Sequence, residues 1–191
     1  MCKIIVMANQ KGGVAKTSST RNLAYSLAEL GKKVLAVDFD PQTNLTISFG
    51  VAPAALQETA ASLMMKLVMD EALPEKESCI LNIGKVDLLP SKKTLTVAEV
   101  NLLIERKDDC LAKLLAPLRA DYDYILVDTG PSLGSLTINA FTAADEIIIP
   151  VDPELFALVG LKELTETISK IKQNLNPKVE IIGILFTKCS K

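Results

Sequence analysis

A lysine- and glycine-rich stretch near the N-terminus has the residue types that bind phosphate groups. It consists of eight consecutive residues: Lys11, Gly12, Gly13, Val14, Ala15, Lys16, Thr17 and Ser18. Glycine lets backbone N–H groups close around an anion, and the positive end of a helix that follows faces the same anion. In such a loop Lys16 would hold the β- and γ-phosphates of a nucleotide, and the hydroxyl of Thr17 would bind Mg²⁺.

Carboxylates follow two apolar stretches that have the pattern of buried strands. Asp38 and Asp40 lie two residues apart, so in an extended segment their side chains point to the same side. Asp128 ends a second apolar stretch, residues 124–128. The carboxyl ends of parallel strands meet at one edge of a sheet, where ligands bind. We therefore expect these carboxylates beside the phosphate loop, with Asp128 holding Mg²⁺ directly or through water.

Strands and helices must alternate to bring these groups together. The expected strands are residues 3–9, 34–38, 86–89, 124–128, 147–151 and 179–186, and the expected helices are residues 17–30, 56–70, 94–105, 108–119, 136–144 and 155–175. This alternation predicts an α/β fold with a mainly parallel sheet flanked by helices. The length of 191 residues fits one domain spanning residues 1–191.

Composition excludes several classes of chemistry. The chain has no histidine, which rules out Ser-His-Asp hydrolysis, Cys-His proteolysis and histidine-ligated metal sites. Only 4% of residues are aromatic, which disfavours base-stacking platforms for single-stranded nucleic acid. A net charge of −2 excludes a uniformly basic DNA-coating protein. A local basic patch that faces DNA stays possible, and scattered solvated lysines are an equally good interpretation. The lysines concerned are Lys92, Lys93, Lys170, Lys172, Lys178, Lys188 and Lys191.

The cysteines and the apolar runs bear on the compartment. The four cysteines form no CxxC pair, which favours free thiols in a reducing cytosol over a cluster bridged between subunits. No apolar run approaches the roughly 18 residues of a membrane span. We therefore expect a cytoplasmic protein without a membrane partner.

The motifs resemble one family. The loop departs from the general pattern GxxxxGK[ST] at Gln10 and Ala15, and the run NQKGGVAKTS instead resembles the ParA family of plasmid and chromosome partitioning ATPases. These have a deviant Walker A P-loop NTPase fold, and MinD is a more distant relative. Three further runs are similar to the family's: DFDPQ (38–42), DTGPSLG (128–134) and PVDPELFAL (150–158). Gly130 replaces a proline of the family's DTPPSLG, and Ala15 replaces a glycine at a position where we expect an ordinary negative φ.

The resemblance implies a set of roles. ATP and Mg²⁺ would be the cofactors, bound by the loop residues 11–18, with Thr17, Asp38 and Asp128 around the metal. Lys11, Lys16 and Asp40 would be catalytic: Lys11 would reach the ATP of a partner subunit, and Asp40 would orient the attacking water. Residues 150–158 would lie at the dimer face.

The resemblance also implies partners. They would be a second copy in an ATP-dependent homodimer, a ParB-like centromere-binding protein and, for the full-length protein, nonspecific DNA of the nucleoid. Family members continue past a strand like residues 179–186, so we expect that the family's C-terminal segment is lacking. Two alternatives stay open: a MinD-like positioning ATPase, and a non-hydrolysing ATP-binding regulatory module, which Ala15 and Gly130 would favour. The DPQ and PSLG segments argue against a third, a carboxylate-ligating synthetase of the same fold.

Overall fold

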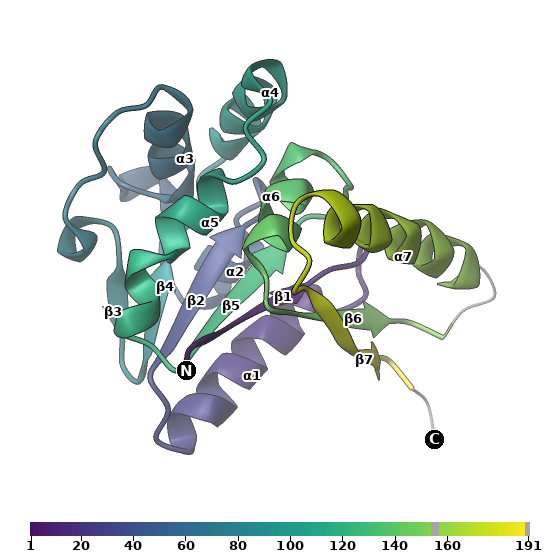
Figure 1. Cartoon of the computed structure of the whole chain (residues 1–191). Coiled ribbons are helices and arrows are strands. Elements are labelled where there is room, and N and C mark those ends of the chain that lie inside the picture. Colours follow the sequence, from purple (N-terminus) through teal and green to yellow (C-terminus); the bar gives the residue numbers. More distant parts are fainter. Residues whose placement is uncertain (154–156, 190–191) are drawn as a thin grey trace.

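A seven-stranded sheet runs through the middle of the molecule in the computed structural model, which describes residues 1–153 and 157–189 (Figure 1). The strands are β1 (Lys3–Met7), β2 (Val34–Phe39), β3 (Leu81–Ile83), β4 (Val86–Leu89), β5 (Tyr124–Thr129), β6 (Glu146–Val151) and β7 (Glu180–Phe186). Their order across the sheet is β3-β4-β2-β5-β1-β6-β7. All neighbours pair in parallel except β3 with β4, which confirms the expected mainly parallel α/β sheet.

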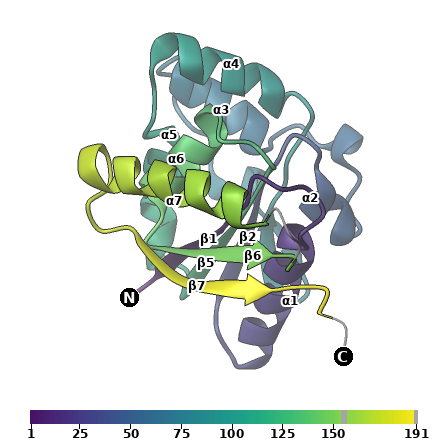
Figure 2. The same cartoon turned by 90° about the vertical axis from the view of Figure 1, so that its right-hand side faces the viewer.

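Helices cover both faces of the sheet. They are α1 (Lys16–Glu29), α2 (Asn44–Ser48), α3 (Ala60–Val68), α4 (Leu95–Glu105), α5 (Cys110–Leu115), α6 (Ser135–Ala143) and α7 (Ala157–Asn174). Figures 1 and 2 show α1 on one side of the sheet and α3 to α7 on the other. Successive strand residues serve the two layers in turn: Leu35 and Val37 pack in the cluster with α3 to α7, whereas Val34 and Ala36 pack with α1 and α2.

Local chemistry explains where the expected helices differ from the observed ones. The helix expected at residues 56–70 begins only at Ala60, because Thr59 and Ser62 form a capping box there. The helix expected at residues 108–119 stops at Leu115, and a 3₁₀ turn follows from Pro117, whose ring cannot continue a helix. The expected start of the last helix, residues 155 and 156, lies outside the described residues.

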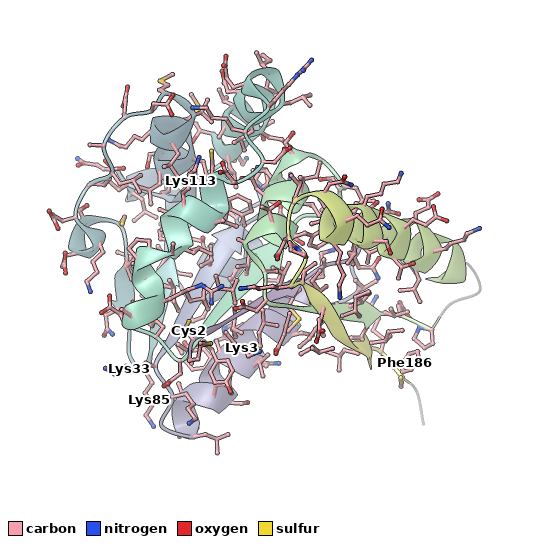
Figure 3. All side chains as sticks on the ribbon, in the orientation of Figure 1. Cys2, Lys3, Lys33, Lys85, Lys113 and Phe186 are labelled. Carbon is pink, nitrogen blue, oxygen red and sulfur yellow. The ribbon has the colours of Figure 1, made fainter. Side chains whose placement is uncertain are left out.

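Strand β7 forms one edge of the sheet and leaves apolar side chains uncovered. Five of its seven residues are large apolar residues at least 40% exposed, up to 63% for Phe186, which Figure 3 labels. All four cysteines are free thiols; three are buried and Cys189 is exposed. Within residues 1–153 and 157–189, no helix is both long and apolar enough to span a membrane.

Candidate functional site

A hollow of about 540 Å³ opens at the carboxyl ends of the strands β2 and β5, beside the loop between β1 and α1. Its lining consists of Gly12, Gly13, Ala15, Lys16, Thr17, Ser18, Asp40, Gln42, Asn44, Thr129, Pro131 and Lys188. Six of the eight loop residues expected at a nucleotide line it. The topology brings them to the carboxylates because β1 and β2 both pair with β5.

Lys16 lies inside the loop that precedes it. Its side chain is 7% exposed, and Nζ donates hydrogen bonds to the carbonyl oxygens of Asn9, at 2.9 Å, and Lys11, at 3.1 Å. Burial lowers the pKa of Lys16, while the nearby carboxylates of Asp128 and Asp40 act in the opposite direction. Lys16, at the start of α1, therefore reaches back to the beginning of the loop, and two backbone carbonyl groups there hold its ammonium group.

Ala15 has a left-handed backbone, so the expected negative φ is wrong. Its φ is 62° and its ψ is 28°, and it stands as the residue that caps α1. The loop must turn sharply there to aim the first N–H groups of the helix inward, and glycine adopts that conformation without a Cβ clash. Thr43, in the loop after β2, is also left-handed, with a φ of 60°. Ala15 lines the hollow and Thr43 lies between the lining residues Gln42 and Asn44, so both hold strained backbone at its rim.

Thr17 joins the phosphate loop to the end of β5. Its hydroxyl donates a 2.6 Å hydrogen bond to Oδ2 of Asp128, whose other oxygen lies 3.4 Å from the hydroxyl of Thr20. Asp128 is fully buried, and burial raises its pKa to about 7; the hydrogen bond from Thr17 lowers it, and the charges of Asp38 and Asp40 raise it further. This crowding of carboxylates is the electrostatic setting that a divalent cation relieves.

The two carboxylates at the end of β2 diverge: Asp40 lines the hollow and Asp38 does not, so the expectation that Asp38 supports the Mg²⁺ shell stays a prediction. Asp38 turns away: its Oδ2 accepts hydrogen bonds from the backbone N–H, at 2.7 Å, and the hydroxyl, at 2.6 Å, of Thr46. The left-handed turn at Thr43 folds α2 back over the strand end, which brings Thr46 to that carboxylate. Burial raises the pKa of Asp38 to about 6, and the bonds from Thr46 lower it. Asp40 alone lines the hollow, with Oδ1 accepting from the N–H of Gln42 at 2.9 Å.

Two loop residues point elsewhere. Lys11 is exposed and is not part of the lining, so the expectation that it serves a partner's nucleotide stays a prediction. Val14 is buried, and its carbonyl oxygen accepts a 3.2 Å hydrogen bond from the hydroxyl of Thr187. The segment resembling the family's dimer face is described only in part, since residues 154–156 lie outside the described residues.

The sequence reasoning missed two members of the site. Asn9 braces the loop: its Oδ1 accepts from the N–H of Lys11 and its Nδ2 donates to the carbonyl of Pro150. Lys188, grouped with the surface lysines, lines the hollow. Its place two residues after the end of β7 was the available signal, because carboxyl ends of parallel strands share one edge. Lys191 of the same group lies outside the described residues.

A second hollow, of about 550 Å³, is built differently. Its lining includes Lys33 and Lys85, which lie near one another in Figure 3, and also Lys76 and Asp121. Lys76 pairs with Asp121 at 2.6 Å, and Lys85 pairs with Glu29. Both of these ion pairs are exposed, and the lining of this hollow contains no glycine-rich loop, so it lacks the features of a phosphate site.

Around that first hollow, a strand, a glycine-rich loop closed by its lysine, a helix and a hydroxyl–carboxylate pair define a P-loop NTPase domain of the α/β class. Residues 2–181 match the family model AAA_31, described as an AAA domain. The chain is 38% identical over 188 residues to the sporulation initiation inhibitor protein Soj of Bacillus subtilis, covering 98% of this chain and 73% of that protein. The chain therefore belongs to the AAA_31 family and, within it, to the ParA/Soj partitioning proteins.

Other relatives and solved structures are similar to the chain in sequence or in fold. An uncharacterized protein of Mycobacterium tuberculosis is 42% identical over 97% of this chain, which spans 58% of that protein's length. A cobyrinic acid a,c-diamide synthase from Mycobacterium smegmatis with bound ADP and magnesium superposes with a TM-score of 0.89 at 36% identity, over 97% of this chain and 74% of that one. A plasmid partition protein from Borrelia burgdorferi superposes with a TM-score of 0.82 at 31% identity, over 99% and 80%.

Proposed function

We propose that this chain is a magnesium-dependent ATPase of the partition type, in which two copies enclose two ATP molecules. The observation that carries the proposal is the 2.6 Å hydrogen bond between Thr17 and Asp128, which places a hydroxyl and a carboxylate together beside the phosphate loop. The similar structure from Mycobacterium smegmatis, whose title names ADP and magnesium, supports the choice of ligands.

The donors beside the loop suit Mg²⁺. Among the described residues, no group of three or more cysteine or acidic side chains is arranged to hold a metal ion by itself. Mg²⁺ prefers one or two protein oxygens together with phosphate oxygens and water, which matches Thr17 and Asp128. The bound ion would neutralise charge on the β- and γ-phosphates, while Asp38 keeps the loop after β2 in place through Thr46.

The remaining roles follow from exposure and position. Lys16 holds the phosphates from within the loop, and the backbone N–H groups of residues 12–18 surround them. Asp40, which lines the hollow 6% exposed, orients the water that attacks the γ-phosphate. Lys11, exposed at the start of the loop, reaches into the site of the second copy and stabilises the charge of the transferred phosphoryl group.

The partners are those of a segregation ATPase. In this proposal the ATP-bound dimer binds nucleoid DNA without sequence preference, and a ParB-like centromere-binding protein stimulates hydrolysis and releases the dimer. Relatives named chromosome partitioning protein ParA, such as that of Caulobacter vibrioides at 36% identity, support the proposal that the protein acts in DNA segregation.

The direct test is the rate of phosphate release from Mg·ATP, measured alone, with nonspecific duplex DNA, and with DNA plus a centromere-binding protein. We expect a low basal rate that rises with both additions, and no rise for Asp40→Ala. A basal rate that no addition changes would contradict the partition assignment.

A second candidate follows from the similarity to a protein titled cobyrinic acid a,c-diamide synthase. An amide-forming ligase passes the γ-phosphate to a carboxylate substrate, so its phosphate release requires that substrate and a nitrogen donor. The same phosphate assay separates the two candidates. Turnover that appears only with a corrin carboxylate and glutamine would favour the ligase; turnover stimulated by DNA favours the partition ATPase.

A further inference from the structure

We propose that Lys188, which follows β7 in the same chain, is a second cation of the nucleotide site. In the absence of nucleotide, an ion pair with Asp152 positions this lysine. The ligand it contacts is the phosphate chain of a nucleoside diphosphate or triphosphate. The inference rests on the proposed nucleotide binding and deepens it, because it assigns a phosphate contact outside the phosphate loop.

The segment after β7 is fastened directly to the phosphate loop. The N–H of Thr187 donates a 2.8 Å hydrogen bond to the carbonyl of Val151, which continues the pairing of β7 with β6. The hydroxyl of Thr187 then reaches the carbonyl of Val14 at 3.2 Å. Thr187 thus connects the ends of β6 and β7 to the phosphate loop, and this fixes the position of the next residue relative to the loop.

That next residue is Lys188, and its backbone is left-handed, with a φ of 56°. This conformation is strained for a lysine, because the Cβ atom crowds the backbone when φ is positive. The turn directs the side chain over the loop: its Nζ lies 3.9 Å from the place where a Cβ on Gly13 would be, and Lys188 is part of the lining of the hollow.

Asp152 forms an ion pair with Lys188. Its Oδ2 lies 3.3 Å from the Nζ of Lys188, and its side chain is 11% exposed, against 57% for the lysine. A nearly buried carboxylate beside a phosphate site repels the ligand unless a cation neutralises it. Lys188 therefore has two effects on a bound phosphate chain: it attracts the phosphates, and it cancels the charge of Asp152.

This arrangement predicts opposite effects for the two partners. Lys188→Met keeps the length of the side chain, removes the cation and exposes the phosphates to Asp152, so we expect the Kd for Mg·ADP and Mg·ATP to rise about three- to tenfold at low salt. Asp152→Asn frees the lysine, so we expect the Kd to fall about two- to fivefold. Lys172→Met, an exposed lysine on α7, is the matched control and should leave both values unchanged.

The experiment is calorimetric titration of Mg·ADP and Mg·ATP into the wild type, the three variants and Lys16→Ala, at about 0.05 M and about 0.5 M NaCl. The difference between Lys188→Met and the wild type should shrink at the higher salt, because the partially exposed charge is screened. Unfolding midpoints of the unliganded proteins show whether each variant is folded.

The outcomes separate this inference from the proposed function. If the wild type binds Mg·ADP, Lys16→Ala does not, and Lys188→Met binds like the wild type at low salt, the role of Lys188 is overturned and the phosphate loop stands. A loss for Lys188→Met that is equal at both salt concentrations would overturn the charge mechanism. If the wild type binds neither nucleotide, the proposed function fails and this inference fails with it.

Discussion

The carboxylate of Asp40 lies so close to Gly130 that a Cβ built on the glycine would be 3.2 Å from its Oδ1. The two residues directly follow the neighbouring strands β2 and β5, whose last pair is Phe39 with Thr129. A side chain at residue 130 would therefore press on the Asp40 carboxylate where it lies in this chain, whereas the family motif has a proline at this position.

Gly130→Ala should push the Asp40 carboxylate aside by a few tenths of an ångström. Because catalysis depends on placement more steeply than binding does, we expect turnover to fall about three- to thirtyfold while the Kd for Mg·ATP changes little. Single-turnover phosphate release and titration measure the two quantities. Gly183→Ala, where nothing lies within 4 Å of the added Cβ, is the control. Equal losses in affinity and turnover would speak against a positioning effect.

Ala15→Gly should stabilise the protein. Glycine relieves a left-handed strain of about 1 to 2 kcal/mol and costs about 0.5 to 1 kcal/mol in backbone entropy, so the free energy of unfolding should rise by about 0.5 to 1 kcal/mol. Urea unfolding measures the change. Ala28→Gly, inside α1, should instead lower stability by about 1 kcal/mol. A destabilised Ala15→Gly would mean that the methyl group makes contacts that outweigh the strain.

Asp40→Ala should separate binding from hydrolysis. Asp40 contacts the N–H of Gln42 and no group of the phosphate loop in the hydrogen bonds of the described chain, so ATP affinity should stay largely intact. Removing a water-orienting carboxylate should slow hydrolysis about 10²- to 10⁴-fold. Quenched-flow measurement of ADP formation gives the rate. A large loss of ATP affinity in Asp40→Ala with a normal rate of hydrolysis would contradict the water-orienting role of Asp40.

Much of the fold was predictable because the strands are strongly apolar and end in polar residues. The run 124–128 has only one reasonable interpretation, and β5 indeed spans Tyr124–Thr129. The short elements α2 and β3 were missed, because α2 makes little more than one helical turn and the three residues of β3 are too few to show an alternating pattern.

The site was predictable in its residue types and less so in its backbone. Spacing placed Thr17 and Asp128 correctly beside each other. It failed at Ala15, because the handedness of a loop residue depends on the turn that tertiary packing imposes. It also gave no sign of the hydrogen bonds from Thr46 to Asp38, because Thr46 returns to that carboxylate only after the turn at Thr43.

Lys11 should act across a dimer interface. It is exposed and lies outside the lining of the hollow in its own chain, so Lys11→Ala should spare folding and much of the nucleotide affinity of a single copy. Dimerisation by ATP and turnover should be lost together, because the same cation bridges the copies and stabilises the transferred phosphoryl group. Sedimentation velocity with Mg·ATP follows the dimer.

Mixing Lys11→Ala with Asp40→Ala tests whether Lys11 acts in the other chain. A mixed dimer has one site with Asp40 from its own chain and Lys11 from its partner, so activity should return to about a quarter of the wild type when pairing is random. If Lys11 acted within its own chain, every site in every mixture would lack one group, and activity would stay absent at all ratios.

Calorimetric titration of Mg·ATP into the wild type and Lys16→Ala tests most directly whether the loop around Lys16 binds the phosphates of ATP. The ammonium of Lys16 is held within the loop by the carbonyls of Asn9 and Lys11, so its removal should cost about 2 to 5 kcal/mol of binding and leave no measurable heat at micromolar protein. Lys32→Ala changes an exposed lysine that lines the second hollow and not the first, and this variant should bind like the wild type. Equal ATP affinity for Lys16→Ala and the wild type would contradict the assignment of the phosphate loop.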